Sequence, residues 1–307
     1  MALTTNEIQR YREVISNTGA QRESMAAARS VPGEYAAQVH RVVRSTETIA
    51  VPAVQLPVKV HVVVAKERRK NCPVHINLHG GGFYFGHSED DDLYCARLAA
   101  ELQGIVLDVD YALCPEHPFP AAFEQSYEVA RWAFRRCGEW DADPERVSIG
   151  GQSAGGNLAA AVALRAAANG DFRFSLQVLD YAALDLLVAV TDKTKSQASD
   201  GPMERRGAAF SMLYCDGDLG LLGSPYVSPA LASERMLTGP APMCIVSAGL
   251  CPFRDIDEGY GLRAAAQGVE VTLRRFVDSR HSFTVRMLDE WRQSQEFITK
   301  AIKRASI

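Results

Sequence analysis

The sequence predicts an α/β fold built on an eight-stranded, mostly parallel sheet flanked by helices. Eight short apolar runs carry this prediction, and from the third run onward they alternate with stretches of helical character, which is the order that parallel strands with crossover helices require. The first two runs have no helix between them, so we expect them to pair as an antiparallel hairpin at the sheet edge. The runs span residues 39–43, 58–64, 74–78, 105–109, 147–149, 176–179, 243–247 and 269–276.

Two segments fall outside this alternation, residues 1–38 and 186–238. In the first, Thr4 and Glu7 can form a capping box, and Ile8, Tyr11 and Ile15 share one face of the helix that follows. With 307 residues and 47% hydrophobic content the chain can bury a large core. We therefore expect a single domain over residues 1–307, with these two segments added to it.

Charge and cysteine usage narrow the class of protein. A formal net charge of −4 favours neither nucleic acid nor an anionic membrane surface as a partner. The seven cysteines lack the spacing of metal ligands, so we expect reduced, buried side chains and no metal site. No leader pattern begins the chain and no segment approaches eighteen apolar residues, which predicts a soluble cytoplasmic protein.

A serine motif lies between the fifth apolar run and an alanine-rich stretch at residues 157–168. Ser153 is its centre, in the sequence GQSAG at residues 151–155. A strand, a sharp turn and a helix in this order form a nucleophile elbow, in which glycines let the backbone pass close to the serine. The motif predicts that Ser153 is a nucleophile for acyl transfer.

A run of glycines follows the third apolar run, in the sequence HGGG at residues 79–82. Consecutive glycines after a strand leave backbone N–H groups free to point at an anion, as the oxyanion of a tetrahedral intermediate requires. The side chain of His79 is expected to support this turn. The aromatic residues Phe83, Tyr84 and Phe85 come next, and they either line a substrate pocket or belong to the core.

Three long motifs together resemble the hormone-sensitive-lipase-like family of α/β-hydrolases, and the likeness covers most of the chain. They are HGGGFYFG at residues 79–86, DYALCPEHPFPAA at 110–122 and GQSAGGNLA at 151–159. The resemblance implies the α/β-hydrolase fold and a helical cap built from about 1–38 and about 186–238. It also implies small carboxylic esters with short or medium acyl chains as substrates, and no metal or organic cofactor.

The resemblance further implies an oxyanion hole formed by the backbone N–H groups of Gly81, Gly82 and Ala154. A homodimer through the last strand and last helix is typical of such proteins.

A serine hydroxyl needs a base to take its proton. His281 is the candidate, because it lies just after the last apolar run, and in α/β-hydrolases the histidine comes last in the chain. The sequence therefore predicts that folding brings His281 beside Ser153.

The carboxylate that normally orients this histidine is missing from its expected place. The resembled family reads roughly DPLRDE here, whereas this chain has Cys251 in place of the first aspartate, in the sequence CPFRDI at residues 251–256. A neutral thiol, with a reference pKa of about 8.5, stabilises an imidazolium poorly.

Three alternatives remain for the acid. Asp255 can turn toward the histidine, Asp180 after the sixth run can replace it, or Ser153 and His281 act as a dyad. The rival function is a weak or inactive ligand-binding protein on a hydrolase scaffold, as in gibberellin receptors. Those receptors lose the histidine that this chain keeps.

Overall fold

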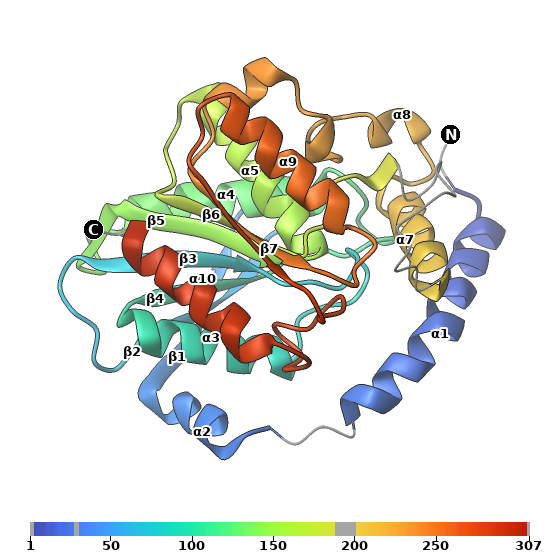
Figure 1. Ribbon diagram of the computed structural model, residues 1–307. Helices are drawn as coiled ribbons and strands as arrows, with labels where there is room; N and C mark the ends of the chain where they lie inside the picture. Colours follow the sequence, from blue (N-terminus) through green and yellow to red (C-terminus); the bar gives the residue numbers. More distant parts are fainter. Residues whose placement is uncertain (1–2, 28–30, 188–200, 306–307) are drawn as a thin grey trace.

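An eight-stranded sheet forms the middle layer of the protein (Figure 1). The computed structural model describes residues 3–27, 31–187 and 201–305. Strands β1 and β2 pair antiparallel, β2 pairs antiparallel with β4, and all other neighbours are parallel, in the order β1-β2-β4-β3-β5-β6-β7-β8. The strands are β1 (Val42–Ile49), β2 (Val58–Ala65), β3 (Cys72–Leu78), β4 (Ile105–Asp110), β5 (Ala142–Gln152), β6 (Leu176–Asp180), β7 (Met243–Ala248) and β8 (Val271–Phe276).

Helices cover both faces of this sheet. Helices α3 and α10 pack on one face, and α4, α5 and α9 on the other (Figure 1). Every residue of β3, β6 and β7 is buried, as expected for parallel strands covered on both sides. The helices are α1 (Thr5–Ala27), α2 (Gly33–Ala36), α3 (Glu89–Leu102), α4 (Ala121–Arg136), α5 (Ala154–Asn169), α7 (Gly201–Tyr214), α8 (Leu219–Leu222), α9 (Arg254–Ala266) and α10 (Trp291–Ala305), with 3₁₀ helices η1 (Ala37–Arg41), η2 (Pro229–Leu231) and η3 (Glu234–Thr238).

The predicted strands and the edge hairpin are confirmed, with one displacement. The first strand was expected at residues 39–43 but runs over Val42–Ile49, because residues 37–41 form η1. Its interior residues are exposed and mostly polar, so the strand has no apolar alternation to reveal it. An edge strand needs no apolar outer face, and its pairing with β2 holds it in place.

The order of the strands determines where a site can form. From β3 the chain crosses to β4 on one side, and then returns to β5 on the other side of β3. At such a switch point the loops after the two strands part and leave a crevice at their carboxyl ends. The glycine run follows β3 and Ser153 follows β5, so both motifs lie at this crevice.

Each of the two added segments divides between different parts of the molecule. Helix α1 packs against α7, far along the chain, and the two lie side by side at one end of the molecule (Figure 1). The rest of the first segment, α2 and η1, packs against α3 instead, while η2 and η3 pack against α5 and α9. Residues 188–200 of the second segment lie outside the described residues.

The start of α1 has the expected capping box. Thr4 N–H donates to Glu7 Oε2 at 2.9 Å, and Glu7 N–H donates to Thr4 Oγ1 at 3.4 Å. Ile15 is buried, with Ile8 and Tyr11 packed against the same core. Within the described ranges, the chain contains no helix with the length and apolar character needed to cross a membrane.

Candidate active site

Ser153 lies on a strained turn between β5 and α5. Its φ is +54° and its ψ is −114°, a backbone conformation that residues other than glycine rarely adopt. The turn is held by its backbone, because Ser153 N–H donates to the Asp180 carbonyl at 3.0 Å and its own carbonyl accepts from Asn157 and Ala183. The hydroxyl makes no helix-capping bond and stays available for chemistry.

The glycines of the elbow are required by close backbone contact. A Cβ on Gly151 or on Gly155 would overlap the carbonyl oxygen of Leu78, the last residue of β3. A Cβ on Gly156 would press against Ala182. The motif is therefore glycine-rich because α5 starts directly against β3 and the end of β6.

The glycine loop after β3 has the backbone shape that was expected of it. Gly81 and Gly82 have φ of +123° and +65°, and a Cβ on Gly81 would overlap the carbonyl oxygen of Phe85. Within the part of the chain that the structure describes, the N–H groups of Gly81, Gly82 and Ala154 have no recorded acceptor. These three N–H groups are thus available to an anionic ligand.

His79 supports the loop as expected. Its ring is buried and stacks on Tyr111 with 4.1 Å between ring centroids, and the Tyr111 hydroxyl donates to the His79 carbonyl at 2.7 Å. The loop is therefore fixed by packing before any ligand arrives.

The structure brings His281 to Ser153. Nε2 of the ring lies 2.9 Å from Ser153 Oγ, and both residues are largely buried. The loop that carries His281 is tied to its own far end, because Arg280 N–H donates to Asp289 at 2.9 Å and the Ser279 hydroxyl donates to Glu290 at 3.1 Å. The ring makes edge contacts with Tyr181 and Phe253, at 4.9 and 5.4 Å between centroids.

The other ring nitrogen of His281 faces a thiol. Cys251 Sγ lies 3.2 Å from His281 Nδ1, and the cysteine is fully buried. The Phe253 N–H also donates to this sulfur, at 3.5 Å. The sequence analysis judged the neutral thiol of Cys251 a poor stabiliser of the imidazolium and left it out of the three alternatives for the acid. The available signal was its position, since it stands where the resembled family has its carboxylate.

Neither of the expected carboxylates contacts the ring. Both oxygens of Asp255 bond to Arg254, at 2.7 and 3.1 Å, and the side chain is 64% exposed. The Arg254 guanidinium lowers the pKa of Asp255. Asp255 therefore pairs with the residue beside it in the sequence rather than turning to His281.

Asp180 is held elsewhere as well. It is fully buried, accepts a hydrogen bond from the Thr284 hydroxyl at 3.1 Å, and its pKa is raised well above the usual range by burial. Asp257 of α9 is buried too, and burial, followed by the charge of Asp180, raises its pKa. Burial thus disfavours the charged form of both carboxyl groups.

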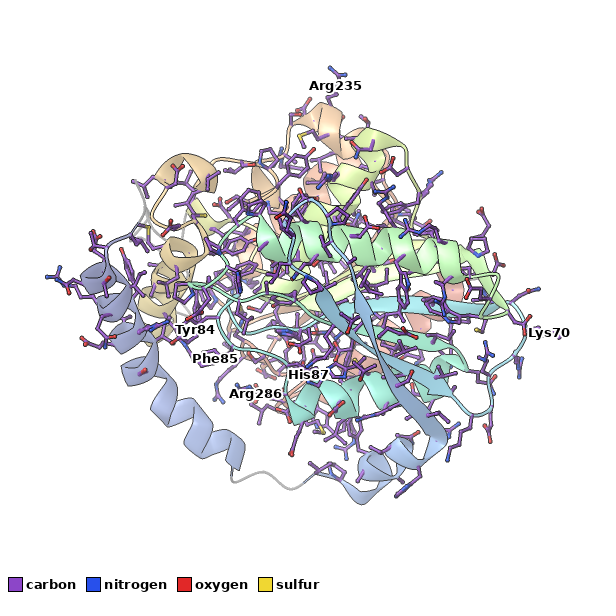
Figure 2. The ribbon with its side chains drawn as sticks, turned by 180° about the vertical axis from the view of Figure 1, so that it is seen from behind. Lys70, Tyr84, Phe85, His87, Arg235 and Arg286 are labelled. Carbon is purple, nitrogen blue, oxygen red and sulfur yellow. The ribbon has the colours of Figure 1, made fainter. Side chains whose placement is uncertain are left out.

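The aromatic residues after the glycine run divide into two groups. Phe83 is buried and stacks on Tyr214 with 3.8 Å between centroids, so it belongs to the core. Tyr84 and Phe85 are partly exposed at the end of the molecule that carries α1 and α7, opposite Lys70 (Figure 2). Phe210 of α7 packs against both rings, at 6.1 Å between centroids, and fills the space where Gly82 has no side chain.

An ion pair fixes the end of the same loop. His87 Nε2 lies 2.8 Å from Oδ2 of the buried Asp108 on β4. Partial burial alone would lower the pKa of His87, but its bond to Asp108 raises that pKa to about 9. The loop is therefore anchored to the sheet at both ends.

All seven cysteines are buried, as expected, and none is joined to another in this structure. Across the described ranges, no cluster of three or more His, Cys, Asp or Glu side chains is arranged to hold a metal ion.

A serine on a tight turn above a parallel sheet, facing a histidine that follows the last strand, is the arrangement of α/β-hydrolases. The sequence profile described as alpha/beta hydrolase fold matches residues 75–285. The chain is 34% identical over 214 residues to esterase LipI of Mycobacterium tuberculosis, covering 69% of this chain and 66% of that protein. It is 42% identical over 95 residues to hormone-sensitive lipase of Bos taurus, covering 31% of this chain and 13% of the lipase. The matched part is thus less than two thirds of either relative.

Among solved structures, the esterase of the archaeon Pyrobaculum calidifontis superposes with a TM-score of 0.80 at 26% identity, and the match covers 100% of both chains. These matches show that the chain belongs to the hormone-sensitive-lipase-like family of α/β-hydrolases.

Proposed function

We propose that the protein is a carboxylic ester hydrolase that acts through a serine acyl-enzyme. The observation that carries the proposal is the 2.9 Å distance between Ser153 Oγ and His281 Nε2 on a strained elbow whose hydroxyl has no structural role. The similarity to proteins named as esterases supports the same activity.

In the proposed mechanism Ser153 Oγ attacks the ester carbonyl while His281 Nε2 takes its proton. The N–H groups of Gly81, Gly82 and Ala154 stabilise the oxyanion, and the positive end of the α5 dipole adds to their effect. His281 then protonates the leaving alcohol, and a water molecule activated by the same ring releases the acid.

Short or medium acyl chains are the proposed substrates. The partly exposed rings of Tyr84 and Phe85, beside the glycine loop and under Phe210, support a small apolar binding surface. We assign α1 and α7 to a cap over this surface, because α7 contributes Phe210 and α1 packs on α7.

Fluorophosphonate labelling tests the activity most directly. We expect a covalent adduct on Ser153 and turnover of p-nitrophenyl butyrate, and loss of both in Ser153→Ala. Ser45→Ala, which changes an exposed serine on β1, serves as the control and should behave like the parent. A folded parent protein with neither labelling nor turnover would instead support a ligand-binding role.

Two expectations from the sequence stay predictions. A cytoplasmic location is one, and a homodimer is the other. Strand β8 lies at the free edge of the sheet, and Leu273 within it and Val277 just after it are exposed. A mass measurement in solution would decide whether two copies associate.

A further inference from the structure

The contacts of Cys251 differ from those of an ordinary buried cysteine. The residue lies in the loop after β7, where its N–H donates to Ala248 and fixes the turn. Its sulfur contacts two nitrogens, the Phe253 N–H at 3.5 Å and His281 Nδ1 at 3.2 Å. The sulfur already accepts one hydrogen bond and is placed to accept a second.

We propose that Cys251 is a positioning residue which, as a thiolate, accepts the Nδ1–H of His281 and fixes the ring tautomer that can take the Ser153 proton. The inference rests on the proposed function. It assigns to this chain a Ser-His-Cys relay in which sulfur replaces the carboxylate.

The charge on sulfur decides the tautomer of the ring. A neutral thiol can donate its S–H to Nδ1, which leaves the ring hydrogen on Nε2, and Nε2 then cannot accept the serine proton. A thiolate can only accept, so it holds the hydrogen on Nδ1 and leaves the Nε2 lone pair facing Ser153 Oγ. The productive state is therefore a thiolate beside a neutral imidazole.

The proton balance is simple in that state. The proton of Ser153 moves to Nε2 as Oγ bonds to the carbonyl carbon, and the carbonyl electron pair moves to the oxyanion. The resulting imidazolium is paired with the thiolate through Nδ1–H. The proton then passes from Nε2 to the leaving alcohol, and the sulfur is unprotonated before and after the step.

On α9, Arg254 lies against the turn, Asp255 is paired with Arg254, Glu258 is paired with Arg275, and Asp257 is buried. From α9, Arg254 donates to the Gly249 carbonyl at 3.0 Å, which places a positive charge against the same turn, although Asp255 binds the same guanidinium. Asp257, also on α9, has a pKa that burial raises well above its ordinary value, so its charged form is disfavoured.

Burial also disfavours the charged forms of the groups from β6 and its end. Burial raises the pKa of Asp180 and of Tyr181 well above their ordinary values, and the Tyr181 ring lies 4.9 Å from that of His281.

The proposal predicts an alkaline pH profile. Because a thiol has a reference pKa of about 8.5, kcat/KM should rise about tenfold per pH unit until the thiolate has formed. In Cys251→Asp a carboxylate is ionised throughout this range, so the limiting pKa should fall to that of histidine, about 6.5.

The aspartate variant should also be faster at neutral pH. Disabling the acid of a serine triad costs on the order of 10⁴-fold in turnover, so regaining an anion should increase the rate about 10- to 100-fold. The longer side chain suits the site, since an N–H···O bond to a carboxylate is about 2.7–2.9 Å, shorter than the 3.2 Å between Nδ1 and sulfur.

The test compares the parent with Cys251→Asp, Cys251→Ser and Cys251→Ala. Rates of p-nitrophenyl ester hydrolysis between about pH 5.5 and 10 are divided by the number of sites that react with a fluorophosphonate, so that unfolded protein does not count. The Ala and Ser variants should lose the alkaline rise and be at least about tenfold slower than the parent near pH 9. Cys244→Ala, a buried thiol on β7, is the matched control and should keep the parent profile.

Ultraviolet absorbance gives a second readout. The thiolate band that the parent has and Cys251→Ala lacks should appear with the same midpoint as the rise in rate. Alanine and serine variants with the parent rate and profile would overturn the proposal in favour of a dyad, as would a rate that rises without the thiolate band. If Cys251→Asp does not fold, the pH profiles of the alanine and serine variants and the thiolate absorbance still test the proposal. A parent without turnover would refute the proposed function before any variant is made.

Discussion

The ion pair between His87 and Asp108 offers a quantitative prediction about stability. It joins the end of the glycine loop to β4, with 2.8 Å between Nε2 and Oδ2 and with Asn77 donating to the other oxygen at 2.7 Å. We predict that His87→Gln destabilises the protein at neutral pH and has little effect at strongly alkaline pH.

The magnitude follows from the pKa of His87. Against the lowering effect of burial, Asp108 raises it from 6.5 to about 9. At about 1.36 kcal/mol per pKa unit this corresponds to about 3 kcal/mol, and since the ring is partly exposed to screening water we expect about 1 to 1.5 kcal/mol. Because the pKa of His87 is raised in the folded state, the pair contributes its full free energy of stabilisation below about pH 6.5. This contribution declines as the pH rises and is lost above about pH 9.

A double-mutant cycle isolates this pair. Urea unfolding of the parent, His87→Gln, Asp108→Asn and the double variant is followed by tryptophan fluorescence at neutral pH and at about pH 10. His61, which stacks on His87 at 4.5 Å, is present in all four proteins, so its contribution cancels. The coupling free energy should be about 1 to 1.5 kcal/mol at neutral pH and near zero at about pH 10. Equal coupling at both pH values, or none at neutral pH, would refute the reasoning.

Three further predictions concern the active site and its surroundings. Gly155→Ala should destabilise the protein by more than about 4 kcal/mol or prevent folding, whereas Gly138→Ala, which has no atom near the added methyl group, should be nearly neutral in urea unfolding. Asp255→Asn should keep ester turnover within about twofold of the parent, because its carboxylate is bound to Arg254; a loss near 10³-fold would return Asp255 to the role of the acid. Relative to the parent, Asp180→Asn should become more stable as the pH rises above about 4, where the unfolded parent ionises while burial raises the carboxyl pKa in its folded state; a difference independent of pH would contradict this.

Most of the fold was predictable because the buried strands are apolar along their whole length. β3, β6 and β7 needed no context beyond their own residues. β1 was misplaced by about three residues since its stability comes from pairing with β2, and a sequence window does not contain its partner. The packing of α1 on α7 and of α2 on α3 was not predictable for the same reason, because it depends on surfaces that meet only in the folded chain.

The site was predictable where the backbone demands particular residues. Glycines at the elbow and in the loop after β3 mark contacts that exclude a Cβ, so the sequence alone indicated the position of Ser153. The partner of His281 was indicated by the position of Cys251 but not by its residue type, because residue type favoured a carboxylate. Arg254 stands beside Asp255 in the sequence and binds both oxygens of its carboxylate, so this carboxylate pairs with the arginine.

The backbone of Leu78 packs against the turn that carries Ser153. The carbonyl oxygen of that residue touches the backbone of the nucleophile turn where Gly151 and Gly155 have no side chains. Contacts between main-chain atoms therefore set the spacing between Ser153 and the glycine loop after β3. This spacing depends little on the shapes of core side chains. Cavities made elsewhere in the core should therefore lower the melting temperature well before they change the rate of each folded molecule.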